Sequence, residues 1–396
     1  MSPPGLQLLL MVGSVVPSPA PATLTAALRR AEVSLSDSGP SGFQLQFQVT
    51  RDPGPLQVDT LVRTTFVPFN RIVLAATLNS AQHPIMDGLI TRVELQPGQP
   101  PQPDTLVVTG EDVSVAMDLY EKSLPYPGMN DSAIAAFVLA QYLEYGLRPN
   151  ISVNLMSPVA LPLEWTTQQA GMTDRAFLNM LASRNGFVFQ VLPGPEPLMN
   201  TAYFGPPRNA GLATQLTSFG FGGGMGPAQR ALTLNELPAS NVRSLSFSYD
   251  ALAATTVAGL VQDTLITDAD LPVLVATPLR SPSLASSSAF ATQFPHIRLC
   301  LLDPQGMDPL TAMLVAQGMV DRSSDQVLTA TGELDVLRYG SILSVAGMVG
   351  VRGAGQAHDG LYYVKQVTHQ ITPDSYTQSF TLTREGWGST VSTVSP

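Results

Sequence analysis

The sequence predicts a β-rich α+β fold with two β-barrel domains and inserted α+β domains, and three observations lead to this prediction. Segments near both ends of the 396-residue chain alternate apolar and polar residues with a period of two, as half-buried strands do. The region between them has apolar residues at helical spacing. A strand–turn–strand unit also occurs twice, once in each β-patterned part.

The first β-patterned region forms residues 1–115, which we interpret as an N-terminal arm and a first barrel. Residues 42–49 alternate without a break, and residues 71–76 are a short apolar run. Residues 91–96 alternate again and end at a proline- and glycine-rich turn, after which residues 104–110 form the next expected strand.

Residues 116–206 are expected to form an α+β insert domain. Asp131 opens a helical pattern that Gly146 closes. A second helix is expected to begin at Thr173, which suits the N-cap, and to end at Asn185-Gly186. Two strand-like runs, 187–191 and 201–204, complete the domain.

The rest of the chain is divided into three parts. Residues 207–264 are expected to hold a linker and the start of a second barrel, with a strand at 242–249. Residues 265–325 look like a loop-rich insert with one helix near 309–320. Residues 326–396 are expected to hold the remainder of the second barrel and a C-terminal tail.

The repeated unit begins with Asp-Gly-Leu and ends with Glu. Asp87 and Glu111 bound the first copy, 24 residues apart, and Asp359 and Glu385 bound the second, 26 residues apart. Ordinary hairpin chemistry is one explanation for so short a match, and a duplicated barrel is the other. Under the second explanation, three chains with two barrels each would make a ring of six similar units.

The composition excludes several classes of protein. Only 13% of residues are charged, against about 25% in ordinary soluble domains, and the net charge is −10. The ordinary apolar fraction excludes disorder, and the acidic balance argues against a sequence-tolerant nucleic-acid binder. The single cysteine, Cys300, excludes an internal disulfide. Because charge is scarce, we expect much of the surface to be buried in an assembly.

The candidate interface residues lie where charge is absent. The apolar run 6–16 contains Leu8 and Leu9, within the charge-free segment 1–28. This run lacks the basic start of a secretion signal and is too short to span a membrane, so no membrane anchor is expected. The other candidates are Phe219 and Phe221 in the uncharged segment 209–229, the segment 339–351, and Trp387 between two glycines.

No catalytic, metal or cofactor site is expected. The adjacent pair His358-Asp359 fits a turn better than a hydrolytic dyad. Glu111 and Asp112 would point to opposite faces of one strand, and the glycine-rich run 350–355 lacks the following helix of a phosphate loop. Cys300 is interpreted as a small buried hydrophobic residue.

Several stretches, taken in order, resemble one known family. They are 41–47, 108–112, 126–131, 173–189 and 379–386. In these the chain resembles the baseplate hub proteins of contractile phage tails and related injection systems, the phage late control protein D group, and the hub part of the valine-glycine repeat spike proteins.

The resemblance implies a homotrimer without catalytic residues, in which two tube-type barrels per chain form a pseudo-six-fold ring. This ring would join the hexameric tail tube to the trimeric spike and leave a lumen for DNA or effector passage. The implied partners are the spike, the tail tube or a tube-initiator protein, the tape-measure protein and the baseplate wedge proteins. The implied location is the virion or an injection particle, assembled in the bacterial cytoplasm. Because the sequence stops at Pro396, shortly after the second barrel, we expect a separate spike chain.

Three alternatives stay open at this stage. An extracellular contractile injection system would need the same hub as a phage. A cell-wall-active tail enzyme is a second reading, and a soluble binding module such as a tail-fibre adaptor is a third.

Overall fold

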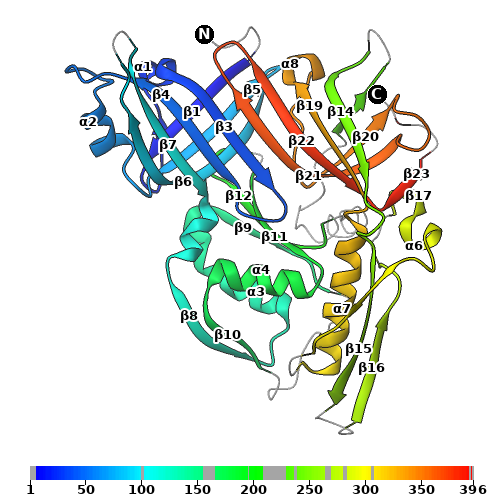
Figure 1. Ribbon diagram of the computed structural model, residues 1–396. Coiled ribbons are helices and arrows are strands. Elements are labelled where there is room, and N and C mark those ends of the chain that lie inside the picture. Colours follow the sequence, from blue (N-terminus) through cyan, green and yellow to red (C-terminus); the bar gives the residue numbers. More distant parts are fainter. Residues whose placement is uncertain are drawn as a thin grey trace.

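The computed structural model describes residues 6–99, 102–154, 166–194, 196–207, 229–235, 239–263, 269–279, 283–304, 307–391 and 394. Two β-rich halves lie side by side, and two smaller inserts extend from the same side of them (Figure 1). The β-rich α+β fold class expected from the sequence is confirmed.

The first barrel is built from the N-terminal strands. They are β1 (Leu6–Gly13), β2 (Ser18–Pro19), β3 (Leu28–Ser36), β4 (Gly42–Val49), β5 (Arg71–Leu78), β6 (Ala81–Gln96) and β7 (Asp104–Asp112). The short helices α1 (Ala22–Ala27) and α2 (Val58–Thr60), the latter continued by a π-helical turn at Leu61–Thr65, lie between strands. The alternation at 42–49 is borne out, since Phe43, Leu45, Phe47 and Val49 are all buried.

The second barrel is assembled from two separate parts of the chain. Its strands are β13 (Gln229–Thr233), β14 (Val242–Tyr249), β19 (Leu328–Asp335), β20 (Met348–Arg352), β21 (Gly360–Ile371) and β22 (Tyr376–Arg384), with helix α8 (Val336–Tyr339) between β19 and β20.

The strands of both barrels form one 13-stranded sheet within the described residues, in the order β14-β19-β22-β21-β3-β4-β7-β6-β5-β1-β2, with β20 and β13 branching from β21. The link is β3, which pairs with β21. One hydrophobic cluster includes buried residues of both halves. The barrels are therefore open and share a core, which the separate strand patterns did not predict.

The two barrels repeat one strand order. Read across the sheet, the first runs β1-β5-β6-β7-β4-β3 and the second runs β13-β20-β21-β22-β19-β14. The strand directions repeat from β5 and β20 onward, whereas β1 is antiparallel to β5 and β13 is parallel to β20. A β-bulge at Thr91 in the first hairpin corresponds to one at Lys365 in the second. Another at Arg29 in β3 corresponds to one at Arg243 in β14. Bulges are local features that fix strand bends, so two corresponding bulges identify the barrels as structural repeats.

A backbone reversal also repeats. Phe69 (φ 64°) and Ala346 (φ 60°) both adopt the left-handed conformation just before β5 and β20, which is uncommon for residues other than glycine. Their amides donate to the carbonyls of Ile90 (2.8 Å) and Val364 (2.9 Å). The bulges align Gly88 with Tyr362. The Asp-Gly-Leu motif would instead align Gly88 with Gly360, so the sequence motif is two residues out of register with the structural repeat.

The first insert follows β7 and has its own core. Its elements are β8 (Glu121–Pro127), α3 (Asp131–Leu139), β9 (Leu147–Ile151), β10 (Thr166–Thr173), α4 (Asp174–Arg184), β11 (Val188–Pro193) and β12 (Asn200–Gly205), with 3-10 turns at Val113–Asp118 and Ala140–Tyr145. Thr173 caps α4 by accepting from the Ala176 amide. Gly186 has a φ of 66° after the helix end, as the Asn-Gly pair predicts.

The second insert separates β14 from β19. It contains β15 (Thr255–Asp263), β16 (Ala269–Val275), β17 (Ala285–Ser288), α6 (Ala289–Thr292), β18 (Arg298–Leu301) and α7 (Pro309–Ser324), and β17 pairs with β23 (Gly386–Ser389). Our division at residue 264 placed β15 with the second barrel, but β15 pairs with β16 and β18 and packs against α7. The expected helix at 309–320 corresponds to α7.

Candidate assembly surfaces

The internal seam between the barrels is a short ladder whose inward face is buried. Residues 31–36 of β3 pair antiparallel with 366–371 of β21. The inward side chains Val33, Leu35 and Val367 are at most 5% exposed, and so is His369. His369 lies 2.8 Å (Nδ1) from the Tyr376 hydroxyl, and burial lowers the pKa of His369 to about 3. This seam shows how one barrel docks on another in this chain.

Asp37 lies at one end of the seam. Its amide donates to the Lys365 carbonyl at 3.1 Å, and its side chain is 5% exposed. The pKa of Asp37 is raised to about 6, chiefly by burial and to a smaller extent by the charge of Asp325, after α7, while Lys365 and Tyr363 oppose the rise. Groups from both barrels and the second insert thus meet at this carboxyl.

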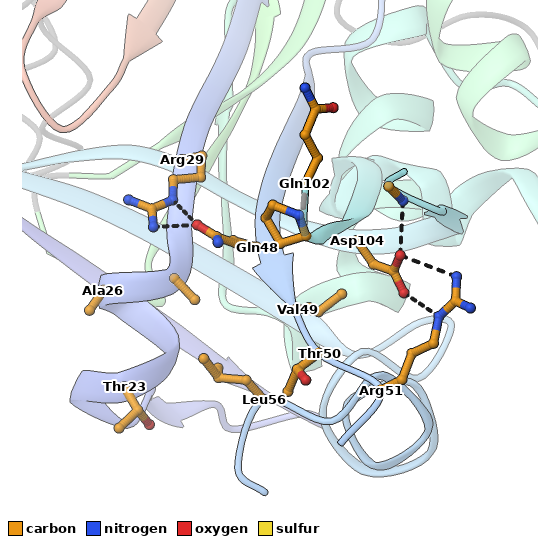
Figure 2. A pocket seen from close by; sticks show the side chains of 13 residues that line it. Thr23, Ala26, Arg29, Gln48, Val49, Thr50, Arg51, Leu56, Gln102 and Asp104 are labelled. Atoms are coloured by element: carbon orange, nitrogen blue, oxygen red, sulfur yellow. Dashed lines mark hydrogen bonds and ion pairs between the residues drawn. The ribbon is translucent and has the colours of Figure 1, made fainter. Parts of the chain in front are cut away.

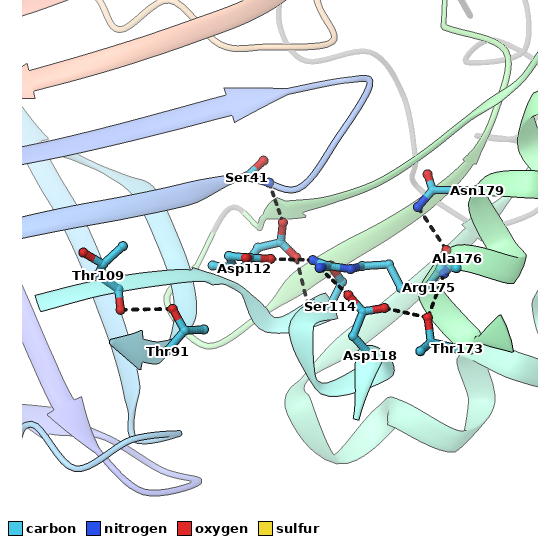
Figure 3. A network of polar contacts seen from close by, with 11 residues as sticks. Ser41, Thr91, Thr109, Asp112, Ser114, Asp118, Thr173, Arg175, Ala176 and Asn179 are labelled. Carbon is cyan, nitrogen blue, oxygen red and sulfur yellow. Dashed lines mark hydrogen bonds and ion pairs between the residues drawn. The ribbon is translucent and has the colours of Figure 1, made fainter. Parts of the chain in front are cut away.

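A polar network fixes the first insert on the first barrel (Figure 3). Asp112, at the end of β7, accepts from the amides of Ser41 (2.8 Å) and Ser114 (2.9 Å). Arg175 of α4 contacts Glu111 at 2.7 Å and also pairs with Asp118. Burial raises the pKa of Asp112. Glu111 and Asp112 are therefore engaged in joining two domains.

An open recess of about 610 Å³ lies at the end of β4 (Figure 2). Its two arginines already have partners within the chain. Arg29 donates to Gln48 (Nε to Oε1, 2.8 Å), and Arg51 donates to Asp104 (Nε to Oδ2, 2.5 Å; Nη2 to Oδ1, 3.2 Å). Asp104 compensates the charge of Arg51, whereas Gln48 is neutral and leaves the charge of Arg29 in the recess without a counter-charge.

Trp387 lies half-buried beside the edge strand β14. Its ring stacks on Tyr249 at 4.5 Å with an interplanar angle of 8°, and His358 meets it edge-on at 5.1 Å. His358 also packs on Phe247 (4.5 Å), and Asp359 accepts from the Ala354 amide (2.8 Å). The His358-Asp359 pair thus belongs to a turn beside an aromatic cluster.

The other sequence-predicted interface residues have different environments where the structure describes them. Leu8 and Leu9 are half-buried on β1, which pairs with β5 along its whole length. Phe219 and Phe221 lie outside the described residues. Segment 339–351 is mostly buried in the core of its own chain, which accounts for its lack of charge. Cys300 is half-buried against the second insert's core.

Sequence reasoning missed an apolar face on the second insert. Helix α7 covers the side of the β16-β15-β18 sheet that carries Val257 and Val261. The opposite side exposes four leucines, each 58–81% accessible: Leu260, Leu274, Leu299 and Leu301. The sequence of β15 gives only a weak signal for this exposed face. Both faces of the strand carry apolar residues, so apolar and polar residues do not alternate clearly.

The described residues contain neither a helix suited to span a membrane nor a metal centre. No helix there has the length and hydropathy needed to cross a bilayer. No group of three His, Cys, Asp or Glu side chains there is placed to hold an ion.

Comparison with known proteins identifies the fold. No family model matches the sequence, and no curated protein matches it. Solved structures of phage tail proteins do share the architecture, over almost the whole chain. The resemblance expected from the sequence is thereby confirmed at the level of the fold.

Three solved structures illustrate this. A tail protein from Neisseria meningitidis MC58 superposes with a TM-score of 0.62 at 14% identity, covering 96% of this chain and 97% of that one. The 43 kDa tail protein of prophage MuSo2 from Shewanella oneidensis gives 0.61 at 10% identity, covering 96% and 98%. The E. coli c3393 protein, a type VI secretion component described as similar to the T4 tail proteins gp27 and gp5, gives 0.52 at 14% identity, covering 90% and 73%.

Proposed function

We propose that this chain is a structural hub of a contractile tail, a homotrimer whose six barrels form a pseudo-six-fold ring. The observation that carries the proposal is the internal repeat, since each barrel has the same strand order and the same two bulges. A repeat of this kind lets a three-fold assembly present six similar units on one face. The ring would match a hexameric tube there and a trimeric spike on the other face, around an open lumen.

The proposed partners follow from this position. They are a second and third copy of the chain, the spike, the tube or tube initiator, the tape-measure protein and the wedge proteins. The ring would belong to a virion baseplate or to an injection particle. The fold shared with phage tail proteins and with a type VI secretion component supports either setting.

Mass measurement in solution tests the proposal. The purified full chain should form a species of three times 42.0 kDa, and it should bind the spike and tube proteins encoded beside it. A chain that stays monomeric at all protein concentrations and ignores both partners would contradict the hub function.

An enzymatic role in cell-wall cleavage is the alternative to a structural one. The candidate His358-Asp359 pair is packed against an aromatic cluster and held by a turn, which supports a non-enzymatic role. Zymography on peptidoglycan with the purified chain separates the two functions, because a lytic band would favour the enzyme.

A further inference from the structure

We propose that the subunits of the ring are joined by strand pairing in a defined register. Residues 245–250, the end of β14 and the residue after it, would lie antiparallel to residues 92–97, the end of β6 and the residue after it, in the next copy, with Tyr249 opposite Val93. This inference rests on the proposed trimer and adds the residues that close it. The occupant of each free edge is thus a second copy of this chain.

The internal seam provides the template. The bulges and strand pairings place β6 in correspondence with β21 and β14 in correspondence with β3. Residues 92–97 correspond to 366–371, and residues 245–250 correspond to 31–36. Inside the chain, 366–371 and 31–36 are paired with each other. Pairing the outer edges in the way that β3 pairs with β21 joins β14 of one copy to β6 of the next.

Both outer edges are open within the described residues. The sheet order begins at β14, which pairs only with β19. Strand β6 pairs with β5 only up to Leu89, and the left-handed turn at Phe69 then carries the chain away. In the second barrel the corresponding turn at Ala346 frees the edge that β3 occupies.

Burial differs between the occupied seam and its open counterpart. In β21, Val367 is fully buried and His369 is 2% exposed. The residues that correspond to them in β6 are more accessible, since Val93 is half-buried and Leu95 is 41% exposed. On the other strand, Val33 (0%) and Leu35 (5%) correspond to Phe247 and Tyr249, which are only half-buried. The open edges therefore carry apolar and aromatic side chains where the internal seam has its buried residues, but no neighbouring strand among the described residues covers them.

The outward side chains are complementary in the same register. Arg92, 72% exposed, would lie opposite the exposed Asp250. Glu94 and Gln96 would face Ser248 and Ser246. Cross-strand pairs of opposite charge stabilise a sheet, whereas a slip of one residue would turn the apolar side chains outward.

The pairing is directional. It joins one edge of a copy to a different edge of the next, and such heterologous contacts make rings when the rotation closes. Exposed sheet edges take a further strand through main-chain hydrogen bonds. Trp387, stacked on Tyr249, would then support the subunit contact from inside its own chain.

Cysteine cross-linking tests the register. In the internal seam Ser34 and Thr368 have hydroxyl oxygens 3.2 Å apart, and their counterparts are Ser248 and Glu94. In a Cys300→Ala background, Glu94→Cys with Ser248→Cys should yield covalent trimers under mild oxidation. Ser34→Cys with Thr368→Cys should cross-link within one chain. Glu94→Cys with Ser246→Cys, shifted by two residues, should cross-link far less.

The outcomes separate this inference from the proposed function. A trimer by mass that gives no intermolecular cross-link, while the Ser34–Thr368 control does cross-link, overturns the strand pairing and leaves the trimer standing. A chain that stays monomeric overturns both.

A charge placed at the proposed contact between copies is an independent test. Leu95→Glu should raise the trimer dissociation constant by more than about tenfold, because a carboxylate would be buried without a partner. Leu143→Glu, at a comparably exposed leucine of the first insert (54%), should leave it unchanged. Equal effects of the two variants on the dissociation constant would count against the proposed contact between β6 and β14.

Discussion

Arg71 and Asp87 form a bidentate ion pair inside the protein, with Nε to Oδ1 at 2.6 Å and Nη2 to Oδ2 at 2.7 Å. Their side chains are only 5% and 2% exposed. Arg71 also donates to the carbonyl of Tyr145 (3.0 Å), and Asn200 donates to Asp87 (2.9 Å). The pair therefore ties β5 and β6 of the first barrel to the first insert.

Removing one partner of this pair should destabilise the chain strongly. Asp87→Ala leaves a buried guanidinium without its counter-charge, and we expect a loss of about 3–5 kcal/mol in the free energy of unfolding. Urea denaturation measures it. The matched control is Arg30→Ala, which breaks the exposed Arg30–Glu32 pair and should cost less than about 1 kcal/mol. Similar losses in both variants would contradict the role of the buried pair.

The two inserts touch through glycines, so a methyl group should separate them. A Cβ on Gly318 of α7 would lie 2.6 Å from the Gly186 nitrogen and 3.2 Å from the Arg184 carbonyl oxygen. Gly318→Ala should destabilise by about 1–3 kcal/mol through overpacking, although alanine favours a helix by about 1 kcal/mol. Met313→Ala, on the exposed side of α7, is the control in thermal denaturation. A Gly318→Ala protein more stable than the parent would contradict this, because it would show that the two inserts move apart without a cost in stability.

His369 should make stability fall with acid. Its folded-state pKa, about 3, lies below the ordinary value of 6.5 because the ring is buried. The unfolded chain therefore binds the proton more readily, and stability present above pH 6.5 is lost as pH falls towards 3. The slope contributed is up to about 1.4 kcal/mol per pH unit. Unfolding of His369→Gln, followed from pH 7 to 4, should lack this component; an unchanged pH profile would refute the assignment.

Asp37 should act in the opposite direction. Its pKa is raised from 3.8 to about 6, so its contribution to stability is full below pH 3.8 and is lost as pH rises through 6. Asp37→Asn should therefore stabilise the chain at pH 8 by about 2–3 kcal/mol relative to the parent, and the difference should vanish below pH 4. A variant less stable than the parent at pH 8 would indicate that the carboxylate is favourably paired there.

Local elements could be predicted from the sequence because their causes are local. Thr173 caps α4 through its own hydroxyl, and the alternation at 376–382 follows the burial of every second side chain. The pairing of β3 with β21 could not be predicted in this way. It joins residues more than three hundred positions apart, and a period-two pattern shows which face is buried but not which strand is adjacent.

The candidate surfaces were predicted less completely. Trp387 was identified from its glycine neighbours, but its stacking on Tyr249 depends on the tertiary fold. Segment 339–351 lacks charge because it lies in the core, and composition alone does not separate a core segment from an interface. The bulges at Arg29 and Arg243, which align the repeats, have no fixed sequence pattern.

A structure of the assembled full chain by electron cryomicroscopy tests the central claim most directly. We expect a closed ring of three copies around a lumen, with β14 of each copy beside β6 of the next and Tyr249 opposite Val93. A trimer held through other surfaces, with both strand edges still open, would contradict the account of how the ring is built.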